Sequence, residues 1–121
     1  MYEYHHLGIP TTDSHEEEEY VPDFKMYTWG YETSEFHIQW MRFDEDCDLH
    51  PLIKTVPHVA FKVASLKEAL KGKKVIHGPS EPLKGFHVAF IEEGGAPIEF
   101  IETNLSEEEL LVLAKKKRAP S

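Results

Sequence analysis

The sequence predicts an α+β fold in which two related modules, the first of them abbreviated, are followed by a C-terminal helix. Residues 6–9 (HLGI) correspond to residues 58–61 (HVAF), and residues 38–40 (IQW) correspond in the same order to residues 98–100 (IEF). Each half therefore has a strand with a histidine and a later strand with Gln or Glu between apolar residues. Such a repeat decides the architecture, because each copy forms the same structural unit.

The first module is expected over residues 1–50. Weak alternation that ends at Pro10 predicts a strand over residues 2–9, and aromatic-rich stretches predict strands over residues 24–32 and 36–43. The polar residues 11–20 leave room only for a degraded helix, so we expect one strand fewer than in the second module. Residues 44–55 then connect the two modules.

The second module, residues 55–103, predicts the order β-α-β-β-β. Strands are expected over 56–63, 73–77, 86–92 and 97–102, with the last two joined through Gly94-Gly95. Ser65 and Glu68 have the spacing of a capping box, which begins a short helix that Gly72 can end. The turn-rich residues 78–82 interrupt the strands, and a second capping box at Ser106 predicts a helix over 106–118.

Length and charge limit the classes of function. A chain of 121 residues predicts one domain. A net charge of −9 argues against sequence-independent nucleic-acid binding and against attraction to anionic membranes. The N-terminus has neither the cationic start nor the apolar stretch of a signal peptide, so we expect a cytoplasmic protein. The acidic run Glu16–Glu19 is either a patch that binds cations or partners, or a solvated loop or short helix.

Side-chain alternation predicts which residues share one concave face. Tyr4 and Gly8 lie on the same side of their strand as His6, while His5 points away. On the later strands, Gln39 shares its face with His37, Met41 and Phe43, and Glu99 shares its face with Ile101. Tyr4, Met41, Phe43 and Ile101 are therefore expected to line a pocket with a polar centre, which is the usual character of a small-molecule site.

The two histidines and their two companions form a candidate metal site. His6, Gln39, His58 and Glu99 offer two imidazoles, an amide oxygen and a carboxylate, which suit Zn²⁺, Ni²⁺, Co²⁺, Mn²⁺ or Fe²⁺. A one-residue slip in register would make His5 the ligand in place of His6. His37 is two residues from Gln39. It is either a hydrogen-bond donor to a metal ligand or a proton shuttle, or else a strand histidine without a special role.

Three segments resemble the vicinal oxygen chelate superfamily, which includes glyoxalase I, methylmalonyl-CoA epimerase, extradiol dioxygenases and bleomycin- or fosfomycin-resistance proteins. They are residues 6–9, 57–61 and 96–102. The resemblance implies paired βαβββ modules that curl into a half-open sheet around a metal, and a homodimer. It also implies ligands at His6, Gln39, His58 and Glu99, a set most like that of the epimerase branch.

Together these observations predict a metal-dependent isomerase, epimerase or glyoxalase-like lyase that moves a proton next to the carbonyl of a small oxygenated substrate. The metal would stabilise the enolate. Glu99 is the carboxylate best placed to double as the base if it loosens from the metal, and His37 would assist. Two alternatives stay open at this point. One is a metal-free protein that binds an antibiotic-like small molecule; the other is an Fe²⁺ dioxygenase that uses two histidines and one carboxylate.

Overall fold

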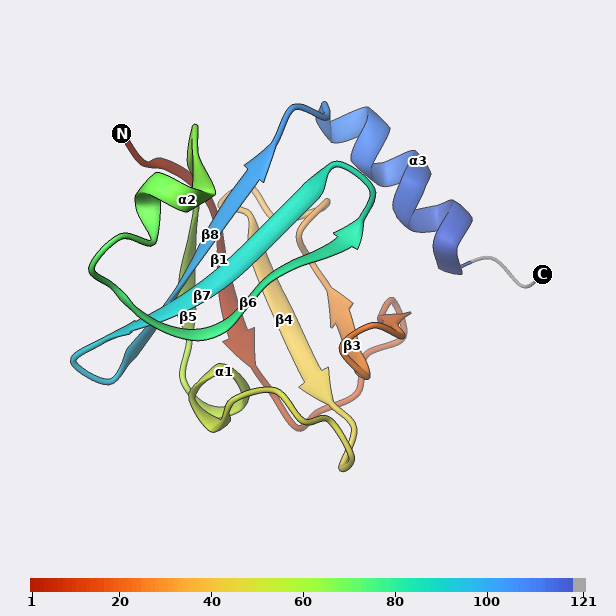
Figure 1. Cartoon of the computed structure of the whole chain (residues 1–121). Helices are drawn as coiled ribbons and strands as arrows, with labels where there is room; N and C mark the ends of the chain where they lie inside the picture. Colours follow the sequence, from red (N-terminus) through yellow and green to blue (C-terminus); the bar gives the residue numbers. More distant parts are fainter. Residues whose placement is uncertain (119–121) are drawn as a thin grey trace.

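Two antiparallel strands, β1 (Glu3–Pro10) and β5 (His58–Lys62), form the centre of one eight-stranded sheet (Figure 1). The computed structural model describes residues 1–118, and the side chains of residues 1–116. The strand order is β2-β3-β4-β1-β5-β8-β7-β6. The other strands are β2 (Glu19–Val21), β3 (Met26–Trp29), β4 (Ile38–Phe43), β6 (Lys74–Leu83), β7 (Phe86–Glu93) and β8 (Ala96–Thr103).

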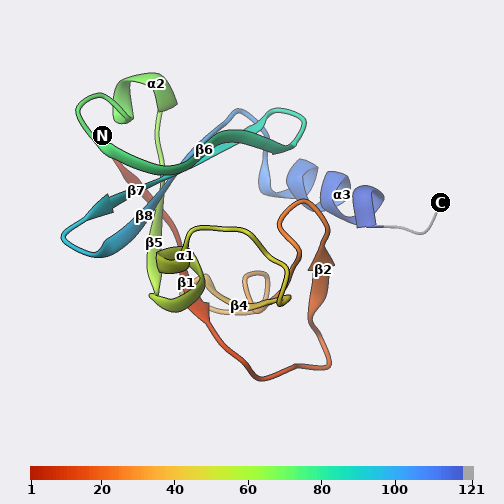
Figure 2. The same cartoon turned by 60° about the horizontal axis from the view of Figure 1, so that its bottom comes forward.

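The order of the strands is the same on both sides of this central pair. β1 is parallel to its neighbour β4, and β5 is parallel to its neighbour β8; β3 and β2 then follow β4 just as β7 and β6 follow β8. The two-module α+β fold predicted from the repeat is therefore confirmed, and the sheet curls into the expected half-open shape (Figure 2).

The expectation of one strand fewer in the first module was wrong. The strand predicted over residues 24–32 exists as the shorter β3, but it is the second strand of a hairpin whose first strand, β2, was not predicted. The chain reverses between Val21 and Met26, where Lys25 has a φ of 51°, and the short strand β2 pairs with β3. The first module is abbreviated in its helix, because residues 11–18 contain none.

The turn predicted over residues 78–82 was also wrong. β6 continues through Pro79 and Pro82 to Leu83, with irregular register against β7. Proline lacks the N–H that an inner strand must donate, but β6 is the last strand of the sheet, and an edge strand tolerates proline.

Three helices complete the described chain: α1 (Pro51–Thr55), α2 (Leu66–Ala69) and α3 (Glu107–Arg118). Both predicted serine caps form, and the one at Ser106 is a complete capping box. The Ser65 hydroxyl accepts from the Glu68 N–H at 3.2 Å, and Ser106 and Glu109 exchange backbone-to-side-chain bonds of 3.0 and 3.1 Å. Figure 2 shows α3 between the end of β6 and β2, the two edges of the curled sheet. None of the described helices is long and apolar enough to cross a membrane.

The two faces of the sheet carry different packing. Leu66 of α2 packs on the outer face of the second module, where it contacts a buried cluster that includes Ala89, Ile91 and Phe100. On the inner face, Ala60, Val88 and Ile101 form the floor of the curl. The inner face is where the predicted site residues should meet.

Candidate metal centre and cavity

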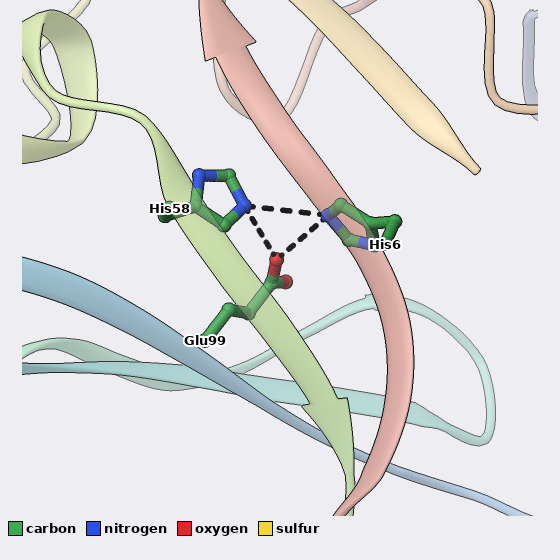
Figure 3. A group of neighbouring side chains, drawn as sticks. All are labelled: His6, His58 and Glu99. Atoms are coloured by element: carbon green, nitrogen blue, oxygen red, sulfur yellow. Dashed lines mark hydrogen bonds and ion pairs between the residues drawn. The ribbon is translucent and has the colours of Figure 1, made fainter. Parts of the chain in front are cut away.

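The register of the central strands brings His6 and His58 together. His6 is opposite Ala60, and Gly8 is opposite His58, so the two histidines are diagonal neighbours across the β1–β5 pair. On the other side of β5, Glu99 is in register with Ala60. Figure 3 shows the three side chains pointing toward one another from β1, β5 and β8.

The three donor atoms form a nearly equilateral triangle. His6 Nε2 and His58 Nε2 are 3.3 Å apart, and Glu99 Oε1 is 3.1 Å from His58 Nε2 and 3.3 Å from His6 Nε2. Bonds of about 2.1 Å to one metal ion, at right angles to each other, separate neighbouring donors by about 3.0 Å. His6, His58 and Glu99 are 6%, 2% and 8% exposed. The spacing and chemistry of these buried donors fit a divalent metal ion.

Gly8 makes room for the His58 ring. A Cβ on Gly8 would lie 2.2 Å from Cε1 of His58, far inside van der Waals contact. A glycine at this position is therefore required by the imidazole across the strand pair, and not by a turn.

The charges in the centre favour an ionised carboxylate. Burial alone would raise the pKa of Glu99, but hydrogen bonds to His58 and His6 outweigh it and hold this pKa well below its usual range. Glu99 therefore carries a negative charge at neutral pH, as a metal ligand must.

The prediction that His5 points away from the cavity was wrong. The register shifts between Tyr4 and His6, so β1 has one extra residue there relative to β5. Such a bulge breaks the alternation of side chains. His5 and His6 both line the cavity, and their Nδ1 atoms are 2.8 Å apart.

His5 connects the centre to α3. Its ring stacks on Tyr31 at 5.2 Å, and the Tyr31 hydroxyl donates to Glu107 at 3.0 Å. Burial and the neighbouring His6 lower the pKa of His5 to about 4, so its ring is neutral at physiological pH. The sequence contained no signal for this chain of contacts beyond the adjacent histidines.

Gln39 has the predicted place in the first module. It is in register with Gly8 on β1, as Glu99 is with Ala60 on β5, and it lines the cavity. His37 also lines the cavity, but it is exposed, and its Nδ1 is 3.1 Å from the His5 carbonyl oxygen, so it lies outside the group of three donors.

Of the four predicted pocket residues, the structure places only Met41 on the cavity wall. Tyr4 is 48% exposed because the bulge turns it to the other face, where its hydroxyl donates to the Phe36 carbonyl. Phe43 packs against the buried cluster of Cys47, Leu49, Ile53 and Phe90. Ile101 is fully buried beside Val88, its register partner on β7.

The cavity has a volume of about 780 Å³ and extends from the three donors to α3. Its wall is largely apolar and includes Phe24, Met26, Met41, Phe86, Val88, Phe90, Leu110 and Leu111. Phe90 packs edge-on against His58 at 5.0 Å. A small molecule in this space would lie between the polar centre and apolar walls, as in most ligand pockets.

Comparison with known proteins shows the fold. A hypothetical protein, BH1468 from Bacillus halodurans C-125, has a TM-score of 0.63 at 21% identity over 87% of this chain and 96% of its own. Methylmalonyl-CoA epimerase from Mycobacterium tuberculosis has a TM-score of 0.58 at 21% identity, over 85% and 89% of the two chains. No family model and no curated protein matches the sequence. The architecture is consistent with the vicinal oxygen chelate fold.

Proposed function

We propose that this protein is a metal-dependent enzyme that moves a proton next to a carbonyl group, as an isomerase, epimerase or glyoxalase-like lyase does. The observation that carries the proposal is the buried triangle of His6, His58 and Glu99 at the end of an apolar cavity. The resemblance of the fold to that of an epimerase supports the same reaction class.

His6, His58 and Glu99 would hold the metal, with Gln39 as a fourth ligand from β4. The metal would supply positive charge that stabilises the oxyanion formed when a proton leaves the carbon next to a carbonyl. Glu99 faces the cavity and is the carboxylate best placed to act as the base, which requires that it loosens from the metal during the reaction. His37, at the exposed end of the cavity, would exchange the proton with solvent.

Elemental analysis of the purified, untagged protein tests the metal site. After reloading with Zn²⁺, Ni²⁺, Co²⁺, Mn²⁺ or Fe²⁺, we expect about one ion per chain, because the donors form one complete set. His58→Ala removes one of the three donors of the triangle, so this variant should lose the metal. Full metal retention in His58→Ala would overturn the site assignment. If the wild-type protein takes up none of these ions, the proposal of a metal-dependent enzyme is rejected.

The reaction class is tested in deuterated water. The metal-loaded protein is incubated with a panel of 1,2-dicarbonyl compounds, 2-hydroxyketones and their thiol adducts, and proton NMR follows the hydrogen next to the carbonyl. We expect exchange that disappears in His58→Ala. If the protein binds metal but exchanges hydrogen for deuterium in none of these compounds, the metal site stands and its proposed chemistry is rejected.

Two other functions have support in specific features. The largely apolar cavity of about 780 Å³ would also suit a metal-free protein that binds a small molecule, and the elemental analysis distinguishes this function from a metal-dependent enzyme. Two histidines and one carboxylate are also the ligand set of non-haem Fe²⁺ oxygenases. That function requires oxygen uptake by the Fe²⁺-loaded protein with a catechol, measured with an oxygen electrode.

The expected homodimer and cytoplasmic location stay predictions. Light scattering on the purified chain checks the first, and fractionation of cells that express the untagged protein checks the second.

A further inference from the structure

The cavity has an unusual distribution of charge. Apart from Glu99 at its inner end, the carboxylates that line it are exposed and stand at the mouth: Glu17, Glu19, Asp23, Glu32, Glu107 and Glu108. Among the described residues, no lysine or arginine lines it. Glu17, Glu32, Glu107 and Glu108 therefore give the described part of the mouth a negative charge, whereas a divalent metal beside Glu99 would leave one net positive charge at the inner end.

These carboxylates come from separate parts of the chain. Glu17 and Glu19 belong to the acidic run of the first module, Glu32 follows β3, and Glu107 and Glu108 form the first turn of α3. The acidic run, which the sequence left open between a binding patch and a solvated loop, thus contributes to the rim of the cavity. The apolar wall behind these carboxylates has a low dielectric constant, so it concentrates their electric field at the mouth of the cavity.

Such an entrance repels polyanions. A coenzyme A thioester carries several phosphate charges, and a protein binds phosphates with Arg, Lys or clustered backbone N–H groups. The described cavity offers carboxylates where such a ligand would need cations. The structural likeness to methylmalonyl-CoA epimerase is a likeness of fold, and the charges at this entrance argue against a coenzyme A thioester as the ligand of this cavity.

We infer that the cavity admits neutral or cationic apolar molecules and excludes polyanions, so that the substrate is an uncharged or positively charged, largely apolar compound. Its negative charge would develop only at the oxygens that reach the metal. This inference deepens the proposed function and rests on it for the role of the metal, but the charge selectivity of the cavity is measurable without metal.

Two naphthalene probes separate charge from shape. N-phenyl-1-naphthylamine is neutral, and 1-anilinonaphthalene-8-sulfonate has the same ring system with one added sulfonate. Both become fluorescent in apolar sites. With metal-free protein at low salt, we expect the neutral probe to bind at least about tenfold more tightly than the sulfonate, and the difference to shrink in 0.5 M salt because salt screens exposed charges.

A triple variant tests where the selectivity arises. We expect a smaller difference in affinity between the two probes when three carboxylates of the mouth are neutralised together, by Glu17→Gln, Glu32→Gln and Glu108→Gln. Glu3→Gln, Glu45→Gln and Glu93→Gln change the net charge equally at exposed positions outside the cavity lining, so this matched control should keep the difference.

The outcomes are separate from those of the metal experiment. Equal or tighter binding of the sulfonate overturns the charge selectivity, and equal narrowing in both triple variants assigns it to net charge and overturns the role of the rim. Failure of the neutral probe to bind overturns the apolar substrate class. Loss of the metal site alone would reject the proposed enzyme and leave the selectivity of the cavity standing.

Discussion

The two modules share their strand order but not their means of covering the outer face. In the second module, Leu66 of α2 packs over Phe100 and its buried neighbours. In the first, no helix forms, and His15 from the loop stacks on Trp29 at 3.7 Å, which in turn stacks on Trp40 at 4.4 Å. Helix packing buries a cluster completely, whereas the stacked rings stay partly exposed. We therefore expect packing in the second module to contribute more to the free energy of unfolding than the stacked rings of the first.

The largest expected effect tests this division of stability. Phe100 and Trp40 occupy equivalent positions of the repeat. Phe100→Ala should cost about 3–5 kcal/mol, because it empties a fully packed site, while Trp40→Ala should cost about 2 kcal/mol, because that ring is only half-buried. Urea unfolding followed by circular dichroism measures both. A larger loss for Trp40→Ala would reverse the assignment.

The second prediction sharpens the difference between the two equivalent oxygen donors, Glu99 and Gln39. Glu99→Gln removes the only negative charge among the proposed ligands and should weaken Zn²⁺ binding by about 100-fold or more, because even residues behind the ligands contribute up to that amount. Gln39→Glu adds a charge and should leave binding equal or tighter. Competition with a fluorescent chelator gives both affinities, and a larger loss at Gln39 would place the strong ligand in the first module.

The third prediction concerns the residues opposite the histidines. Gly8→Ala should weaken Zn²⁺ binding by about tenfold or more while the chain still folds, since the new Cβ displaces the His58 ring, on which coordination depends. Ala60→Gly, at the equivalent position in the second module, adds no atom near His6 and is the matched control. Equal affinities for the two variants would show that the His58 ring can move aside without loss.

The smallest expected effect concerns the second ring nitrogen, Nδ1, of the two histidine ligands. His6 Nδ1 lies against His5, whereas the buried His58 Nδ1 has no hydrogen-bond partner among the described residues. His5→Phe keeps a ring beside Tyr31 but removes the nitrogen that orients His6, so Zn²⁺ affinity should fall by about tenfold. The same chelator competition checks it, and an unchanged affinity would mean that strand packing alone orients His6.

The sequence predicted the centre better than its surroundings. The repeat located His6, His58, Glu99 and Gln39 because each occupies a register position fixed by the paired central strands. The prediction that Tyr4 lines the cavity was wrong because side-chain alternation assumes a regular strand. No residue type at positions 4–6 indicates a bulge. The rim was not predictable, because it unites Glu17, Glu32 and Glu107, whose proximity exists only after the sheet curls.

The position of the three donors has a thermodynamic consequence. His6 belongs to one module, while His58 and Glu99 belong to the other, so an ion held by all three would join the halves across their central seam. Because only the folded chain offers the complete set, the ion would raise the free energy of unfolding, by about 4 kcal/mol at a free concentration 1,000 times its dissociation constant. With metal bound, the two modules would then unfold together, and the melting temperature would rise with the free metal concentration.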